Sequence, residues 1–222
     1  MESIIKVGGS LARDPKSLRA LCPVLSELAG EHNFLIVPGG GKFADTVREF
    51  DREYCLSAET SHKMAVLSMD QYAMLLADLI SNSRTVYSLE EAEVFLSEGG
   101  VPILLPSRSM FTEDPLDHSW DFTSDSIAAW IAGSSNAERL ILVTDVDGVF
   151  SQDQKGGLGG ELVPRISVYD LLKEGVETCV DMGLPKILPK IQSKCYVVNG
   201  KHPSRIRKIL EEKKTVCTRI TV

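Results

Sequence analysis

The chain has 222 residues, of which 43% are hydrophobic, a formal net charge of −7 and a pI near 5.2. This length suffices for one large α/β domain with a full core. The acidic balance argues against general affinity for nucleic acid or for an anionic membrane, since both require a basic surface. Five scattered cysteines without a CxxC pair favour reduced thiols over a disulfide framework or a metal site. Because no export signal and no apolar run of about 20 residues is present, we expect a cytoplasmic protein.

The first predicted strand and its turn, residues 4–10, combine an apolar run with Lys6 and two glycines, Gly8 and Gly9. Glycines at a strand end let the backbone approach a bulky group closely, and a lysine supplies a compact charge for phosphate oxygens. This pattern favours a phosphate site. An ordinary tight turn with a solvated lysine explains the stretch equally well, because short glycine motifs have many false positives.

A second apolar segment, residues 34–41, ends in three consecutive glycines. A helix is predicted between the two glycine turns, over residues 15–28, so the turns should lie side by side at one edge of a parallel sheet. Ligands bind at such edges. Neither turn has the spacing of G-x-x-x-x-G-K-[ST] or of G-x-G-x-x-G, which excludes a P-loop and a dinucleotide-binding fingerprint.

The helix predicted for residues 42–54 places Arg48 where it could reach an anionic group of an acceptor. A pair with Asp45 or Asp51 on the same helix is the more common arrangement, because charges three residues apart are neighbours on a helix surface. Both interpretations of Arg48 stay open.

Residues 57–81 contain no Gly or Pro, and the part from Met64 to Ile80 is apolar around most of a helical circumference. One sheet cannot bury such a helix on every side, so the pattern predicts a homo-oligomer formed through it. His62 and Asp70 lie within the segment and are candidates for substrate contact. Hydrogen bonds that only pack the helix explain them at least as well.

The chain then alternates between predicted strands and helices, except for the long segment 107–122, which suits a lid or a substrate-facing loop. Ser124 and Asp125 open the next helix, where the helix dipole alone would favour Asp125. The strand predicted from residue 139 ends in acidic and glycine residues. This ending, followed by the glycine-rich run 155–160, is typical of a nucleotide-binding loop with a mobile cover, or of a long hairpin.

Four ordered motifs resemble those of the amino acid kinase family. They are Lys6-Val7-Gly8-Gly9-Ser10, Pro38-Gly39-Gly40-Gly41, Thr123-Ser124-Asp125 and Val143-Thr144-Asp145-Val146-Asp147-Gly148-Val149. The resemblance implies a three-layer α/β/α sandwich with a mostly parallel central sheet. It also implies a single domain over 1–222, with the acceptor site in about 1–135 and the ATP site in about 136–222.

Further stretches are similar to the small kinases of methanofuran biosynthesis, which phosphorylate [5-(aminomethyl)furan-3-yl]methyl phosphate to the diphosphate. These stretches are residues 43–48 followed by Asp51, residues 69–72, and residues 180–181 ahead of 184–186. The alternatives are a kinase of isopentenyl phosphate, a nucleoside monophosphate or an amino acid, or a non-catalytic oxyanion-storage or regulatory protein. An acceptor that carries a protonated amine predicts a carboxylate in its site, for which Asp70 is the candidate.

The resemblance also implies roles for individual residues, with ATP as phosphoryl donor and Mg²⁺ carried on the ATP phosphates rather than in a protein metal site. The implied catalytic residues are Lys6, Asp125 and Lys186. The implied ATP-binding residues are Lys6, Gly8, Gly9, Ser10, Thr144, Asp145, Asp147, Gly148, Val149, Phe150 and Lys186. The implied substrate-binding residues are Gly40, Gly41, Arg48, His62, Asp70 and Ser124. No Gly-Gly-Met stretch precedes the second catalytic lysine, so Lys190 competes with Lys186 for that role.

Overall fold

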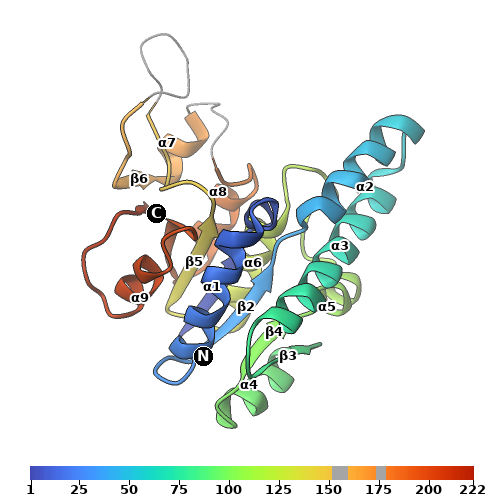
Figure 1. The fold of residues 1–222 in the computed structure, drawn as a ribbon. Coiled ribbons are helices and arrows are strands. Elements are labelled where there is room, and N and C mark those ends of the chain that lie inside the picture. The colour runs from blue at the N-terminus through green and yellow to red at the C-terminus, as the bar shows by residue number, and fades with distance from the viewer. Residues whose placement is uncertain (152–159, 174–178) are drawn as a thin grey trace.

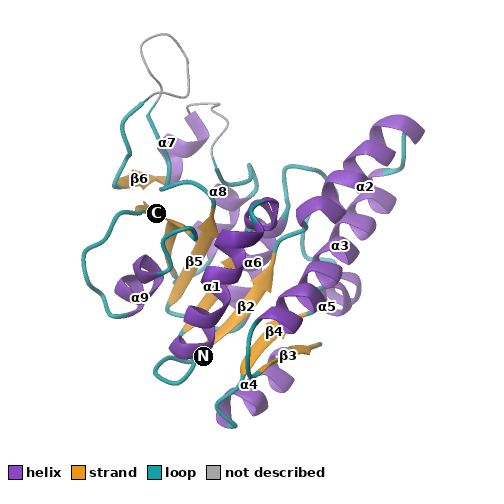
Figure 2. Cartoon of the chain, viewed as in Figure 1, coloured by secondary structure: helices purple, strands orange, loops and turns teal. Residues whose placement is uncertain are grey.

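The computed structural model describes residues 1–151, 160–173 and 179–222. The predicted glycine-rich cover at 155–160 therefore lies outside the described residues except for Gly160. Eight strands form one sheet in the order β3-β4-β2-β1-β5-β7-β8-β6 (Figure 2). The strands are β1 (Ser3–Val7), β2 (Phe34–Pro38), β3 (Ser83–Val86), β4 (Val101–Leu104), β5 (Arg139–Thr144), β6 (Arg165–Ser167), β7 (Lys194–Asn199) and β8 (Thr218–Thr221). All neighbouring pairs are parallel except β7 with β8, as the sequence predicted for most of the sheet.

Helices connect most of the strands. They are α1 (Pro15–Leu28), α2 (Gly41–Tyr54), α3 (Ala58–Leu79), α4 (Leu89–Ser97), α5 (Ser107–Glu113), α6 (Ser124–Ser134), α7 (Val168–Lys173), α8 (Leu184–Ile187) and α9 (Ser204–Leu210). The start of α1 follows from its sequence, because the Asp14 side chain accepts a hydrogen bond from the Lys16 N–H at 3.1 Å and Pro15 is the first helical residue. No helix among the described residues is long and apolar enough to cross a membrane.

Helices cover both faces of the sheet, which gives the three-layer sandwich seen in Figure 1. A separate hydrophobic core fills the space between the sheet and the helices on each face. Side chains alternate along β1, so Ile4 packs in one core while Ile5 and Val7 pack in the other. Helices α6 and α8 contribute to the core of Ile4. Helices α1 and α9 contribute to the opposite core, together with the second half of α3. The fold class predicted from the sequence is confirmed.

The two glycine turns touch each other at the carboxyl edge of β1 and β2. A Cβ atom on Gly9 would lie 2.1 Å from the Gly41 N atom, and one on Gly39 would lie 2.5 Å from the Gly9 N atom. Only glycine permits this approach of backbone to backbone. Gly41 also has a φ of 56°, a conformation that side chains disfavour. The predicted pair of adjacent turns is therefore confirmed.

The segment 107–122 differs from the predicted loop, because its first part is helix α5. Asp70 on α3 explains where α5 begins. Its carboxylate accepts hydrogen bonds from the Ser107 N–H at 3.2 Å and from the Ser107 hydroxyl. The carboxylate thus satisfies a free N–H at the start of the helix. The periodicity of this short helix is too brief to stand out in the sequence.

Candidate active site

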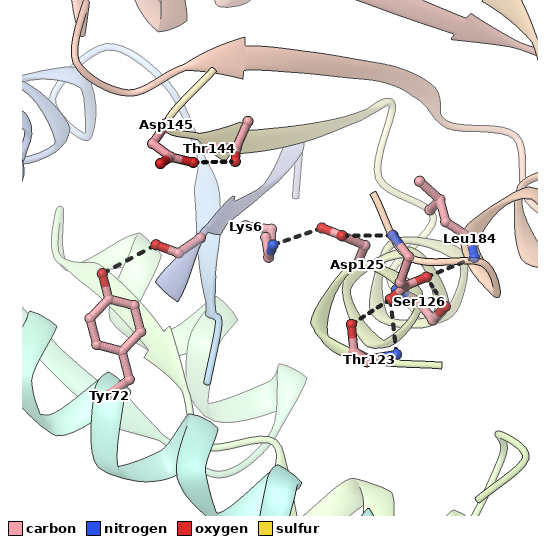
Figure 3. Close-up of polar contacts among 10 residues, drawn as sticks. Lys6, Tyr72, Thr123, Asp125, Ser126, Thr144, Asp145 and Leu184 are labelled. Atoms are coloured by element: carbon pink, nitrogen blue, oxygen red, sulfur yellow. Dashed lines mark hydrogen bonds and ion pairs between the residues drawn. The ribbon is translucent and has the colours of Figure 1, made fainter. Parts of the chain in front are cut away.

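Lys6 and Asp125 form a buried ion pair behind the first glycine turn. Because side chains alternate along β1, Lys6 points to the same face as Ile4, where the first turn of α6 carries Asp125. The Lys6 Nζ lies 2.7 Å from Asp125 Oδ1, and the two residues are 8% and 6% exposed. Figure 3 shows this pair at one end of a chain of polar contacts that continues to Thr123, Ser126 and Leu184. The sequence placed both residues at a site, and the structure brings them into direct contact.

Two effects act in opposite directions on the Asp125 carboxyl. Burial, and to a lesser degree the Asp181 charge, raises the pKa of Asp125, whereas the Lys6 ammonium and the hydrogen bond from the Asp181 N–H offset part of that rise. The Asp181 N–H donates to Asp125 Oδ2 at 3.2 Å, so each carboxylate oxygen has a partner. The lysine is consequently held in one position before any ligand arrives.

Asp181 is a site residue that the assignment of roles from sequence missed. One of its oxygens accepts from the Thr123 N–H, the Thr123 hydroxyl and the Ser126 N–H, at 2.9, 2.9 and 3.0 Å. The other accepts from the Ser126 hydroxyl at 2.6 Å and the Leu184 N–H at 2.9 Å. The carboxylate therefore joins the start of α6 to the start of α8 (Figure 3). The sequence did contain a signal for this role, because an Asp three residues ahead of Leu184-Pro185 can accept a hydrogen bond at the start of a helix.

The helix that Asp181 anchors, α8, carries Lys186. This side chain is exposed, and its Nζ lies 5.1 Å from the centroid of the Phe122 ring. Phe122 lines the cavity described below, which places the Lys186 ammonium near the cavity wall. Lys190 is also exposed and lies in the following 3₁₀ turn, Leu188–Lys190.

The first glycine turn lies next to the buried pair. The Lys6 Nζ is 3.7 Å from the position that a Cβ atom on Gly8 would occupy. The Gly8 N–H donates to the Val143 carbonyl of β5 at 2.8 Å, and the Tyr72 hydroxyl of α3 donates to the Gly8 carbonyl at 3.4 Å. The turn is thus fixed from both sides, and Ser10 after it lines the cavity.

The predicted nucleotide residues after β5 have several partners within the protein. Thr144 and Asp145 lie at the end of the strand, where the Thr144 hydroxyl donates to Asp145 Oδ1 at 3.4 Å. Asp147 accepts a hydrogen bond from the Asn199 amide at 2.8 Å and pairs with Arg205. These contacts lower the pKa of Asp147, with the Asn199 bond as the largest cause.

Gly148, Val149 and Phe150 continue this segment toward β8. A Cβ atom on Gly148 would lie 2.3 Å from the Thr218 Oγ1, and the Val149 N–H donates to that oxygen at 2.8 Å. Phe150 is 39% exposed. The Thr218 hydroxyl therefore holds the segment against β8.

A cavity of about 520 Å³ opens beside the two glycine turns. Five of the six predicted substrate-binding residues line it, namely Gly40, Gly41, Arg48, His62 and Ser124. Its volume lies within the range of small-molecule sites. Asp70 is the exception, because it does not line the cavity and its carboxylate is bound to Ser107 instead. The placement of Asp70 corresponds to the packing role that the sequence left open.

Two arginines and one carboxylate form a charged group on the cavity wall. Arg13 pairs with Asp45 at 3.0 Å, and Arg48 pairs with the same carboxylate at 3.5 Å. The Arg48 guanidinium also stacks over the Trp120 ring, 4.5 Å from its centroid. The predicted pair of Arg48 within α2 is therefore present, and the residue also lines the cavity. Its contact with an acceptor stays a prediction.

Asp51 and Trp120 form a second polar contact in the cavity. The sequence suggested Asp51 only as a possible partner of Arg48, and it gave Trp120 no role of its own. Asp51 accepts hydrogen bonds from the Trp120 Nε1–H and the Ser61 hydroxyl, each at 2.7 Å. Trp120 comes from the coil between α5 and α6. This coil also brings His118 onto His62, with stacked rings whose centroids are 4.6 Å apart. Burial, and to a lesser degree His118, lowers the pKa of His62.

Comparison with known proteins identifies the family. The model of the amino acid kinase family matches residues 1–208. The chain is 36% identical over 221 residues to the [5-(aminomethyl)furan-3-yl]methyl phosphate kinase of Methanocaldococcus jannaschii, covering 98% of this chain and 96% of that protein. It is 26% identical over 217 residues to a uridylate kinase of the same organism, covering 90% and 91%.

The fold comparison agrees with the sequence comparison. The crystal structure of uridylate kinase from Archaeoglobus fulgidus matches with a TM-score of 0.77 at 24% identity, covering 100% of both chains. This similarity spans both the half with the glycine turns and the half with β7 and β8. The chain therefore belongs to the amino acid kinase family and is a phosphotransferase.

Proposed function

We propose that this protein transfers the γ-phosphoryl group of ATP to the phosphate of [5-(aminomethyl)furan-3-yl]methyl phosphate, which gives the diphosphate. The observation that carries the proposal is the 36% identity to a kinase of that compound over 98% of the chain. A cavity of about 520 Å³ beside two glycine turns supports it, because such a cavity can enclose a small phosphate monoester.

Phosphoryl transfer requires the protein mainly to align donor and acceptor and to neutralise the charge that spreads over the transferred group. We assign Lys6 and the Gly9 N–H group to the donor phosphates, and Gly40 and Gly41 to the acceptor phosphate. The Gly8 N–H is bound to the Val143 carbonyl, so Gly8 contributes by letting the backbone come close to the phosphates. A phosphate acceptor is already nucleophilic, so the step needs no general base and no covalent enzyme intermediate.

Asp125 orients Lys6 in this proposal, and Lys186 supplies the second cation at the transferred group. The contact between the Lys186 ammonium and the ring of Phe122 supports this choice over Lys190. Ser10, Thr144, Asp145, Asp147, Gly148, Val149 and Phe150 complete the nucleotide side. The proposal thus keeps the acceptor part in about 1–135 and the ATP part in about 136–222.

Mg²⁺ enters the proposal together with ATP. Among the described residues, no group of three or more His, Cys, Asp or Glu side chains is arranged so that it could hold a metal ion, and the Asp125 carboxylate is already paired with Lys6. This donor set fits an ion that keeps phosphate oxygens and water as its main ligands. The ion would supply charge neutralisation at the phosphates.

A coupled assay of ADP release tests the proposed acceptor. We expect turnover with the aminomethylfuran phosphate to exceed turnover with UMP, isopentenyl phosphate or an amino acid. UMP is the second candidate, because the chain is 26% identical to a uridylate kinase. Preferential turnover of UMP would replace the proposed acceptor, and ATP hydrolysis without transfer to any acceptor would contradict a kinase function.

We also propose that the protein forms a homo-oligomer through the Met64–Ile80 part of α3. Leu67, Met74 and Leu75 lie on one side of this helix and are 45%, 57% and 39% exposed. An exposed apolar stripe of this kind is typical of a contact surface. Sedimentation should show an oligomer that the double substitution Leu67→Glu, Met74→Glu dissociates. A wild-type monomer at micromolar concentration would contradict the proposal.

A further inference from the structure

Asp51 is an ionised carboxylate on the cavity wall whose hydrogen-bond partners are both neutral. One oxygen accepts from the Ser61 hydroxyl and the other from the Trp120 indole N–H. These bonds lower the pKa of Asp51, with the Trp120 bond as the larger cause. Each carboxylate oxygen has two lone pairs, so the group retains capacity to accept from a ligand.

The cations of the cavity are engaged elsewhere. Arg13 and Arg48 both pair with Asp45, and Arg48 also stacks on Trp120. Among the residues that the structure describes, no cation lies within ion-pair distance of Asp51. A carboxylate that faces a cavity without a counter-ion is suited to a cationic group of a ligand.

The two ends of α2 give the cavity opposite electrostatic character. Gly40 and Gly41 stand at its amino end, where free N–H groups and the helix dipole favour a phosphate. Asp51 stands in its last turn, where the dipole favours a cation. A ligand that lies along the cavity therefore meets an anion-binding end and a cation-binding end.

We propose that Asp51 binds a protonated amine on the acceptor, at the end remote from its phosphate, and so selects amine-bearing acceptors. This inference rests on the proposed function, since that acceptor carries an aminomethyl group, and it adds the residue that recognises the group. Ser61 and Trp120 are positioning residues that orient the carboxylate. Asp70, the carboxylate that the sequence suggested for this role, lies outside the cavity and is bound to Ser107.

The test measures equilibrium binding by titration calorimetry in the absence of ATP, so it does not depend on turnover. The two ligands are [5-(aminomethyl)furan-3-yl]methyl phosphate and its analogue with a hydroxyl in place of the amine. Asp51→Asn keeps the shape of the side chain and removes its charge. We expect it to weaken binding of the amine ligand by about 10- to 100-fold. Binding of the hydroxyl analogue should stay unchanged.

Two further variants complete the test. Asp70→Asn makes the same substitution on α3 and should leave the affinities for both ligands unchanged. Trp120→Phe keeps an aromatic ring but removes the N–H donor, so it should weaken amine binding in the same direction and by less. This second variant covers the case in which Asp51→Asn fails to fold.

Three results would overturn the inference. They are equal loss of affinity for both ligands in Asp51→Asn, no loss for either ligand, or no binding of the amine ligand to the wild type. Failure of the proposed function has a different signature, namely normal selective binding of the amine ligand with no ADP release when ATP is added. The binding and turnover experiments therefore separate the two claims.

Discussion

The Lys6–Asp125 pair and the cavity beside the glycine turns differ in how their charged side chains are partnered. Both partners of the pair are buried with their charged atoms 2.7 Å apart, and Asp181 ties that pair to α8. In the cavity, Asp51 lies in the open wall with neutral partners only. The first region is complete before a ligand binds, whereas the second still has a charge to be matched.

This difference assigns rate and selectivity to separate regions. Charges that are fixed in advance need no rearrangement as the reaction proceeds, so the pair should serve any acceptor equally. A charge without a counter-ion contributes only when the ligand supplies the opposite one, so the cavity should decide which acceptor is used. Substitutions in the pair and in the cavity should therefore have separable kinetic effects.

Lys6→Met should have the largest effect. We expect a decrease in kcat of about 10²- to 10³-fold, because the lost interaction belongs mainly to the transition state. The KM for ATP should change far less. Steady-state kinetics with two acceptors checks this, and the decrease should be similar for both. Near-normal turnover in Lys6→Met would contradict the proposed mechanism.

Lys186→Met should come next, with a decrease in kcat toward the lower end of the same range of about 10²- to 10³-fold. Lys190→Met is the matched control, because it removes an exposed lysine from the next turn of the chain. It should have little effect. The opposite ranking of the two variants would assign the role to Lys190 while leaving the family membership intact.

Asp181→Asn should reduce both stability and rate, by smaller factors. The amide replaces one carboxylate oxygen with a donor. Whichever oxygen is replaced, the new donor faces an N–H group, because the Ser126 N–H donates to one oxygen and the Leu184 N–H donates to the other. We expect a loss of about 1–3 kcal/mol in the free energy of unfolding. Urea denaturation measures this loss. Unchanged stability would show that Asp181 does not join α6 to α8 in solution.

His62 should give the smallest effect, through pH. Its pKa in the folded state is lowered by burial, so the unfolded chain takes up more protons as the pH falls below about 6.5. Its contribution to stability is therefore complete above that value and decreases at lower pH. Urea denaturation at about pH 7.5 and about pH 5.5 should show this loss, and His62→Gln should reduce it.

His32→Gln is the control for this measurement, since His32 pairs with Glu2 and does not line the cavity. This substitution should leave unchanged the loss of stability at low pH that His62 causes. An equal pH dependence in the wild type and in His62→Gln would contradict the assignment.

The parts of the fold that follow from local sequence were predictable. The apolar strands, the glycine turns and the Asp14-Pro15 helix start each depend on a few adjacent residues, and the structure has all of them. The contact between Lys6 and Asp125 was also within reach. The family resemblance assigned both residues to one site, whereas the acidic first turn of a helix was also explained by the helix dipole alone.

The carboxylate that lines the cavity could not be predicted in the same way. Asp70 and Asp51 are both acidic residues on predicted helices, and the sequence does not show which of them faces the cavity. That choice depends on where α5 and the following coil pack. Ser107 donates a hydrogen bond to Asp70, and Trp120 donates one to Asp51. The two partners are 37 positions apart in the first bond and 69 in the second. Hydrogen bonds over such separations follow from tertiary packing rather than from local pattern.

A crystal structure with the aminomethylfuran phosphate and a non-hydrolysable ATP analogue would test the account most directly. We predict that the acceptor phosphate lies at Gly40 and Gly41, facing the donor phosphates held by Lys6, and that its amine lies within hydrogen-bond distance of the Asp51 carboxylate. An acceptor bound outside this cavity, or an amine that points away from Asp51 toward solvent, would contradict the account.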